Sequence, residues 1–264
     1  VFFKWYGRSY ANVLKCFTRF FVQNEESKRL LESIGIKDVD VVGDTRFDRV
    51  LQIKEAAKQL PICEAFRTGV ASSQSADVPH HDFKVFVAGS SWPPDENIFI
   101  PFFNEHKDWR LLIAPHVIAE EHLKLILSLI KGKKVVRYTQ TTPEEAAEAD
   151  VLIIDCFGLL SSMYNYGDVA YIGGGFGVGI HNTLEAAVWN MPVIFGPNNK
   201  KFQEAQGLLK SDGGFEINTY EDFSGLMSSL MNDETFLKQA GDKAGAFVAH
   251  LAGATDKVLA SVKL

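Results

Sequence analysis

A glycine-rich segment that leads into a polar run holds the residues whose types and spacing are best suited to chemistry. It reads GGGFGVGIHNTLE over residues 173–185 and follows the short apolar run VAYI at 169–172. Glycines let a backbone adopt positive φ and approach a ligand closely, and the unpaired N–H groups at a helix start attract anions. A strand, a glycine loop and a helix capped near Asn182 or Thr183 therefore predict an anion site. Phosphate is the expected anion.

Glu185 would lie about one turn inside that helix. From there its carboxylate can accept hydrogen bonds from the two hydroxyl groups of a ribose. The alternative is that the glycines only allow tight packing between strand and helix, and that Glu185 only favours the helix dipole. The composition of the loop leaves both interpretations open.

Apolar runs and helical periodicity alternate through the middle of the chain. The pattern predicts strands over 84–88, 110–114, 135–137, 151–154, 169–172 and 192–195, and helices over 95–106, 119–131, 143–148, 158–166 and 182–189. Such alternation is typical of an α/β fold with a parallel, doubly wound, Rossmann-like sheet, in which ligands bind at the carboxyl ends of the strands. Upstream, a strand at 21–23, a helix over about 25–35 and a strand at 39–43 predict a further βαβ unit.

Polar residues follow two of the predicted strands, at the edge where ligands bind in such sheets. Ser90 and Ser91 offer hydroxyl and N–H groups to a phosphate, or alternatively cap the helix that follows. His116 can donate a hydrogen bond or a positive charge, although a single histidine also serves structural roles. Loops that are distant in sequence would thus meet at one edge of the sheet.

These motifs resemble those of the 3-deoxy-D-manno-octulosonic acid (Kdo) transferases. The glycine segment continues through MPVIFGP at 191–197 and FQE at 202–204, and four further segments match in the family's order: VGDTRFD at 42–48, GSSWPPDE at 89–96, APH at 114–116 and DCFG at 155–158. The family consists of GT-B glycosyltransferases that transfer Kdo from CMP-Kdo to lipid A precursors of Gram-negative lipopolysaccharide. The resemblance covers roughly residues 20 to 210.

The resemblance implies a fold of GT-B type and a site for the donor CMP-Kdo, with transfer that inverts the sugar. The residues that it assigns to the donor are Ser90, Ser91, His116, Phe157, Gly158, Leu159, Gly174, Gly175, His181, Asn182 and Glu185. Backbone groups at 157–159 would read the edges of cytosine, and the helix start at His181 and Asn182 would stabilise charge on the departing phosphate. No metal and no other cofactor is implied.

The chain departs from the family pattern in two loops. The family commonly places an Arg before this histidine and a Glu-Arg pair after it, whereas here Pro115 precedes His116 and Val117 follows it. The family often has Ser where this chain has Gly175, and glycine where it has Ile180. Backbone N–H groups must then provide more of the contact with the donor.

The chain opens at Val1 without an initiator Met, so we expect it to be the C-terminal part of a longer transferase. The expected organisation is the end of an N-terminal, acceptor-binding lobe over 1–50, a helical linker over 51–82 with a flexible connector at 69–82, and a CMP-Kdo-binding domain over 83–264. In this family the general base belongs to the N-terminal lobe. No catalytic residue is therefore assigned here, the lipid A precursor would bind through that lobe, and this chain alone is expected to be inactive.

Residues 1–22 contain no acidic side chain and combine basic with aromatic residues at helical spacing: Lys4, Arg8, Lys15 and Arg19 with Phe3, Tyr6, Tyr10, Phe17 and Phe20 or Phe21. A basic amphipathic helix can lie on an anionic membrane surface. The alternative is that its aromatic face packs against the N-terminal lobe. A membrane role fits an enzyme held peripherally at the cytoplasmic face of the inner membrane of a Gram-negative bacterium.

The composition excludes several other classes. A net charge of −6 argues against nucleic acid as a partner, and three cysteines without paired spacing indicate neither a disulfide framework nor a zinc site. Two alternatives to a Kdo transferase remain. One is another GT-B sugar-nucleotide enzyme, such as a UDP-N-acetylglucosamine transferase or 2-epimerase, which a preference for uridine over cytidine nucleotides would reveal. The other is a non-catalytic nucleotide-binding or membrane-peripheral module.

Overall fold

The computed structural model describes residues 8–69, 83–177 and 179–262 of the chain. Two compact units are present: Val1–Gln52 together with Ala249–Leu264, and Ile53–Val248. They are called the small unit and the sheet unit below. The predicted flexible connector at 69–82 lies almost wholly outside the described residues.

The small unit has two short parallel strands, β1 (Phe20–Val22) and β2 (Val39–Val41), joined through α2 (Glu25–Glu32). Asn24 caps α2 by accepting a hydrogen bond from the backbone N–H of Ser27. Helices α1 (Arg8–Leu14) and α13 (Ala254–Ser261) complete the unit, with the start of α3 (Thr45–Glu55) and the end of α12 (Glu234–Leu251). The predicted βαβ unit is therefore present.

The amphipathic helix predicted over residues 1–22 is wrong in its extent. Helix α1 ends at Leu14, and β1 begins at Phe20. Arg19 precedes this strand and forms an ion pair with Asp40 of β2 at 2.7 Å. Strand pairing with β2 thus overrides the helical spacing of the basic residues, while Phe3, Lys4 and Tyr6 lie outside the described residues.

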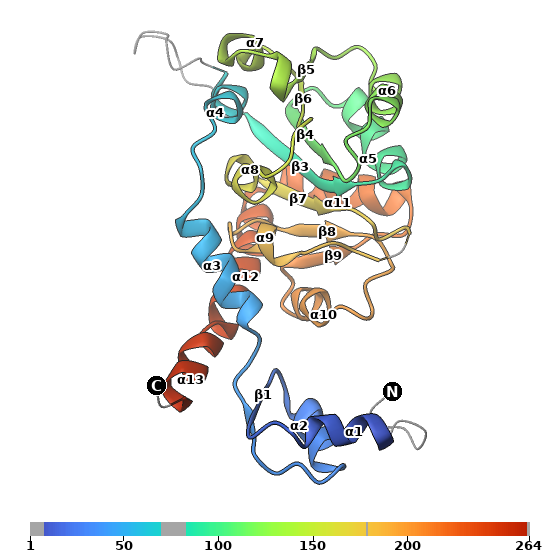
Figure 1. Cartoon of the computed structure of the whole chain (residues 1–264). Coiled ribbons are helices and arrows are strands. Elements are labelled where there is room, and N and C mark those ends of the chain that lie inside the picture. Colours follow the sequence, from blue (N-terminus) through green and yellow to red (C-terminus); the bar gives the residue numbers. More distant parts are fainter. Residues whose placement is uncertain (1–7, 70–82, 178, 263–264) are drawn as a thin grey trace. The chain divides into compact units, whose positions relative to one another are not determined.

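A seven-stranded parallel sheet forms the centre of the sheet unit (Figure 1), in the order β5-β6-β4-β3-β7-β8-β9. Its strands are β3 (Lys84–Ser91), β4 (Trp109–Pro115), β5 (Val135–Arg137), β6 (Val151–Ile153), β7 (Val169–Ile172), β8 (Val193–Phe195) and β9 (Gly214–Glu216). Every pairing between neighbours is parallel. The predicted parallel, doubly wound α/β fold is confirmed.

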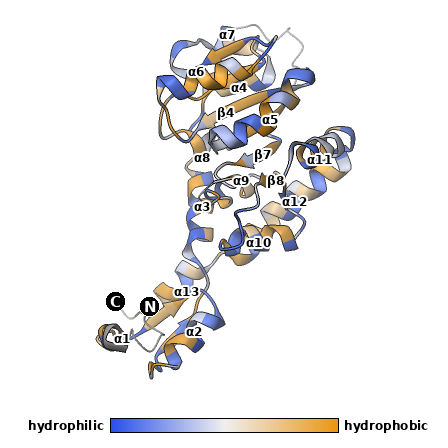
Figure 2. Cartoon of the chain, turned by 90° about the vertical axis from the view of Figure 1, so that its right-hand side faces the viewer, coloured by the Kyte–Doolittle hydropathy of each residue, from blue (hydrophilic) through white to orange (hydrophobic). Residues whose placement is uncertain are grey.

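Helices connect these strands and cover the sheet. They are α4 (Pro61–Thr68), α5 (Pro93–Glu105), α6 (Glu120–Leu129), α7 (Pro143–Ala147), α8 (Leu160–Met163), α9 (Leu184–Ala187), α10 (Gln203–Lys210), α11 (Tyr220–Asn232) and most of α12, with 3₁₀ turns at Tyr138–Gln140 and Tyr164–Tyr166. The helices show hydrophobic and hydrophilic faces around strands that are mostly hydrophobic (Figure 2). This pattern is expected for a sheet buried on both faces.

An extensive hydrophobic core lies between the sheet and helices α5, α6 and α11. Phe86 of β3 is its centre and packs against Phe99 and Phe103 of α5 and Phe223 of α11, with ring centroids 4.8–5.8 Å apart. Contacts of this kind exclude water and fix helix positions. The second half of α5 is thereby held against the first part of β3.

The compact units divide the chain differently from the predicted domains. Residues 53–68 belong with the sheet, because Arg110 of β4 donates hydrogen bonds to the carbonyl oxygens of Phe66 in α4 and Ala147 in α7. Residues 249–264 belong with the small unit, where Asp48 accepts hydrogen bonds from the N–H and hydroxyl groups of Thr255. The described part of the predicted helical linker contains the end of α3 and a separate helix, α4, which begins at Pro61.

Candidate functional site

The loops after β3, β4 and β7 meet at the carboxyl edge of the sheet. The carbonyl oxygen of Ser91 accepts a hydrogen bond from the N–H of His116, and that of Gly89 accepts one from Gly173, both at 2.9 Å. Parallel strands end at the same edge, so their register brings together residues that are far apart in the sequence. The predicted convergence of these loops is therefore present.

The glycine loop packs backbone against backbone. A methyl group on Gly173 would lie 2.1 Å from the carbonyl oxygen of Ser90, and one on Gly175 would lie 2.5 Å from the backbone nitrogen of Gly196. The N–H of Gly174 donates to Asp95 at 2.9 Å, and that of His181 donates to the Gly173 carbonyl at 3.1 Å. Gly173 and Gly175 thus allow tight packing of the backbone. The N–H groups of Gly174 and His181 already donate hydrogen bonds within the protein, so neither is free for the anion that the sequence led us to expect.

Three aromatic rings from different loops stack at this edge. His116 lies 4.6 Å from Trp92 and 4.4 Å from His181, measured between ring centroids. The indole N–H of Trp92 donates to Nε2 of His181 at 3.2 Å. An indole nitrogen only donates, so Nε2 of His181 is unprotonated and the ring carries its proton on Nδ1. Burial, followed by the charge of His116, lowers the pKa of His181 below its ordinary value.

Beside His116 lies a cavity of about 200 Å³. It is lined by Ser90, Ala114, Pro115, His116, Ile118, Ile154, Cys156, Phe157, Gly158 and Leu160. Four predicted donor-binding residues are thus brought together, namely Ser90, His116, Phe157 and Gly158, and Leu159 is the next residue of the same loop. Ser90 occupies a left-handed conformation with φ 53° at an irregularity in the β3 register, and Phe157 is 81% exposed.

Ser91 does not line this cavity. Its side chain is fully buried and donates a hydrogen bond to Oε1 of Glu96 at 2.8 Å. The positive φ of Ser90 coincides with the irregularity in the β3 register between Gly89 and Ser91. Ser91 therefore belongs to the support of the site, and its predicted contact with a phosphate is wrong for the hydroxyl group.

Glu185 and Asn182 lie together at the start of α9. The helix begins at Leu184, so Glu185 is in its first turn and not one turn inside as predicted. Asn182 Oδ1 accepts the N–H of Leu184 at 3.1 Å and thus replaces the first helical bonds, and its amide nitrogen donates to Glu185 at 3.0 Å. The Glu185 carboxylate remains only partly buried, so its second oxygen can face a ligand.

Two adjacent carboxylates in the first turn of α5 connect the loops, a role that sequence reasoning missed. Asp95 accepts hydrogen bonds from Trp92 N–H, Gly174 N–H and the Tyr171 hydroxyl. Glu96 contacts Ser91 and His122. Both side chains are fully buried, and this burial raises the pKa of each carboxyl, although their hydrogen bonds oppose the shift. The sequence signal available was only that two acids begin a helix.

Asp155 is bonded to the end of β5 and to the turn that follows it. Its carboxylate accepts hydrogen bonds from the N–H and hydroxyl groups of Thr139 and forms an ion pair with Arg137 at 3.0 Å. Burial acts to raise its pKa, but these partners outweigh it and the pKa is lowered. Asp155 therefore helps to fix the position of the loop that carries Phe157.

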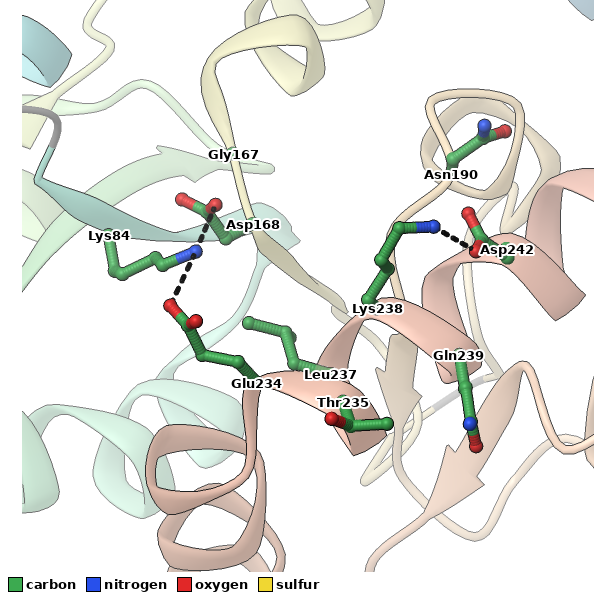
Figure 3. Close-up of a pocket in the computed structure, with 10 residues that line it drawn as sticks. All are labelled: Lys84, Gly167, Asp168, Asn190, Glu234, Thr235, Leu237, Lys238, Gln239 and Asp242. Atoms are coloured by element: carbon green, nitrogen blue, oxygen red, sulfur yellow. Dashed lines mark hydrogen bonds and ion pairs between the residues drawn. The ribbon is translucent and has the colours of Figure 1, made fainter.

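The opposite, amino edge of the sheet carries a larger cavity of about 700 Å³. Figure 3 shows Lys84 between Asp168 and Glu234, at 3.5 and 3.9 Å, and Lys238 paired with Asp242 at 2.5 Å. Gly167, Asn190, Thr235, Leu237 and Gln239 complete its lining. None of the predicted donor-binding residues lies here.

The described part of the chain contains no cluster of three or more His, Cys, Asp or Glu side chains placed to hold a metal ion. Among the helices that the structure describes, none combines the length and the apolar character required to cross a membrane.

Comparisons with known proteins agree with the resemblance found in the sequence. No protein-family profile matches the chain. The 3-deoxy-D-manno-octulosonic acid transferase of Rickettsia prowazekii is 26% identical over 239 residues, which cover 88% of this chain and 48% of that protein. The chain spans about half the length of the curated relatives it matches.

Two solved structures match the fold. The C-terminal CMP-Kdo binding domain of WaaA from Acinetobacter baumannii superposes with a TM-score of 0.54 at 16% identity, covering 76% of this chain and 97% of that one. A UDP-N-acetylglucosamine 2-epimerase from Listeria monocytogenes, described as putative, gives 0.57 at 12% identity, covering 93% and 61%. The fold is thus of the GT-B type, and in sequence this chain is similar to the Kdo transferases.

Proposed function

We propose that this chain binds CMP-Kdo at the carboxyl edge of its sheet and acts within a glycosyltransferase that transfers Kdo to a lipid A precursor in lipopolysaccharide biosynthesis. The observation that carries the proposal is the sequence match to a Kdo transferase over 88% of the chain. The position of the cavity supports it, since ligands of such sheets bind at this edge. No cofactor is required by this chemistry.

The chemistry of the cavity suits a nucleotide. Exposed Phe157 offers a flat apolar surface to a cytosine ring, and backbone groups of the same loop can pair with its edge. His116 and Ser90 provide polar groups for the phosphate or the sugar carboxylate on the opposite wall. His181, neutral and protonated on Nδ1, would act as a hydrogen-bond donor and not as a cation. Glu185 would accept the ribose hydroxyl groups.

The remaining parts of the reaction are assigned to the rest of the transferase. We propose that the small unit completes the acceptor-binding lobe, that the sheet unit is the donor-binding domain, and that the general base and the lipid A site belong to the rest of the acceptor-binding lobe. The reaction would take place at the cytoplasmic face of the inner membrane, to which the protein would bind peripherally. On this view the chain alone binds donor without transferring sugar.

Calorimetric titration with CMP and UMP tests the proposal. The wild-type chain should bind CMP more tightly than UMP, and Glu185→Ala should weaken CMP binding about tenfold, the effect of losing a charged hydrogen-bond acceptor. Glu221→Ala is a matched control, because Glu221 is also the second residue of a helix, α11, but lies exposed elsewhere. Tighter binding of UMP would favour a UDP-sugar enzyme, and an equal loss in both variants would contradict the assignment of Glu185.

A further inference from the structure

A closed ring of hydrogen bonds lies directly beneath His116. The Ser91 hydroxyl donates to Glu96 Oε1 at 2.8 Å, and Glu96 Oε2 contacts Nε2 of His122 at 2.9 Å. Nδ1 of His122 lies 2.9 Å from the carbonyl oxygen of Val117, the residue after His116. The N–H of His116 then donates to the carbonyl oxygen of Ser91, at 2.9 Å, and closes the ring. The ring therefore connects β3, α5, α6 and the His116 loop.

The protons of the ring can be placed from the chemistry of its members. A carbonyl oxygen only accepts, so Nδ1 of His122 carries a hydrogen. One further proton lies between Nε2 of His122 and Glu96, on the imidazole as an ion pair or on the carboxyl as a neutral pair. The pair has no net charge in either form, which makes its burial tolerable. Glu96 and Ser91 are fully buried and His122 is 8% exposed, so water does not compete for these bonds.

We propose that Glu96 and His122 are positioning residues that hold His116 in the orientation required for the donor. This inference rests on the proposed function, because it assigns a role to His116 in binding CMP-Kdo. His116 is itself exposed and stacks on Trp92 and His181. The ring fixes its backbone on both sides, through its own N–H and through the carbonyl oxygen of Val117. An exposed imidazole on a loop thereby becomes preorganised for an anionic ligand.

The neighbouring carboxylate shows the same arrangement for the glycine loop. Asp95 accepts the N–H groups of Trp92 and Gly174, and the hydroxyl of Tyr171. One helical turn thus holds both walls of the site: Asp95 positions the loop that carries His181, and Glu96 positions the loop that carries His116. Buried polar networks are often no more stable than apolar ones, so a role in placing the two loops accounts for the presence of two buried carboxylates here.

Two substitutions separate positioning from simple stability. His122→Phe keeps the ring volume but removes both hydrogen bonds. Glu96→Gln can preserve the ring, since its amide oxygen accepts from Ser91 and its amide nitrogen donates to an unprotonated Nε2 of His122. Ile126→Ala is the matched control, because Ile126 lies on the same helix as His122, is fully buried in the core and belongs to no polar network.

The experiment measures the imidazole resonances of His116 by NMR on histidine-labelled protein and the dissociation constant for CMP by calorimetry. His122→Phe should shift the His116 resonances and weaken CMP binding about tenfold, whereas Glu96→Gln should leave both near the wild-type values. Ile126→Ala should lower the melting temperature without either change. If His122→Phe fails to fold, Ser91→Ala, which removes one hydroxyl of the ring, takes its place.

Unchanged His116 resonances in His122→Phe would overturn the inference, as would a loss of CMP affinity in Ile126→Ala equal to that in His122→Phe. A Glu96→Gln variant as impaired as His122→Phe would also overturn it. Failure of the wild-type chain to bind CMP would instead count against the proposed function. The NMR comparison needs no ligand and would still decide whether Glu96 and His122 position His116.

Discussion

The two edges of the same sheet use charged side chains in opposite ways. At the amino edge, ion pairs surround the larger cavity, and apart from Asp168, at 11%, their side chains are well exposed, up to Glu234 at 86% and Lys238 at 76%. At the carboxyl edge, Asp95 and Glu96 are fully buried and bind loop backbone and side chains. Exposed pairs contribute little stability, whereas buried acids are costly unless all their hydrogen bonds are made. The smaller cavity therefore lies beside the more ordered polar groups.

The largest effect is expected where the backbone of the glycine loop meets β3. Gly173→Ala would place a methyl group 2.1 Å from the Ser90 carbonyl oxygen, which cannot move without displacing β3. We expect a loss of about 3 kcal/mol or more in the free energy of unfolding, measured by urea denaturation. Gly225→Ala in α11 is the control, since nothing lies within 4 Å of its new methyl group, and it should gain about 0.5–1 kcal/mol. Similar losses in both would contradict the packing account.

Removing one hydrogen-bond acceptor from the carboxyl edge should lower the free energy of unfolding more than removing one from the amino edge. In Asp95→Asn, three hydrogen-bond donors meet a side chain with a single acceptor oxygen. The buried donors left without an acceptor should lower the free energy of unfolding by about 1–3 kcal/mol. Asp242→Asn weakens only the exposed pair with Lys238, worth about 0–1 kcal/mol. Thermal unfolding of both variants would measure the difference. Equal costs would remove the contrast between the two edges.

A smaller effect should follow loss of the indole donor. Trp92→Phe keeps an aromatic ring against His116 but leaves Nε2 of His181 without its hydrogen-bond donor. The free energy of unfolding should fall by about 1 kcal/mol. Nitrogen NMR of the histidine ring should then show His181 losing its preference for the Nδ1 proton. A ring that stays in the Nδ1-protonated form would mean that another group sets its protonation.

Acid should weaken the carboxyl edge through His181. Its pKa in the folded protein lies below the ordinary 6.5, with burial as the main cause. The unfolded chain therefore binds a proton before the folded one does, so the contribution of neutral His181 is complete above pH 6.5 and declines as the pH falls toward the lowered pKa. Urea unfolding above pH 6.5 and at lower pH should show a greater loss of unfolding free energy on acidification for the wild type than for His181→Gln. Equal losses in the two proteins would exclude His181 as the source of the pH dependence.

The sheet could be predicted because its strands carry a strong local signal. Buried parallel strands are nearly continuous apolar runs, so β7 was predicted with the bounds observed, and β3 differs only at its carboxyl end. Helix bounds were less accurate. The helix expected over 182–189 is only α9 (Leu184–Ala187), since Asn182 bonds the N–H of Leu184 through its side chain.

Tertiary partners left no comparable trace in the sequence. Asp95 and Glu96 looked like the acids that commonly begin a helix, and nothing nearby announced Tyr171, Gly174 or His122 as their partners. Ser91 was expected beside a phosphate, but the positive φ of Ser90 directs the next side chain inward. Motifs thus pointed to the edge that we propose binds a ligand, while long-range hydrogen bonds decide which side chains are exposed there.

We propose that the carboxyl edge, and not the larger cavity, binds the nucleotide. An NMR titration of the isotope-labelled chain with CMP, following backbone amides, distinguishes the two. We expect shifts at Ser90, His116, Phe157 and Glu185, with Asp168 and Leu237 unchanged. Shifts confined to Asp168, Leu237 and their neighbours at the amino edge would contradict it.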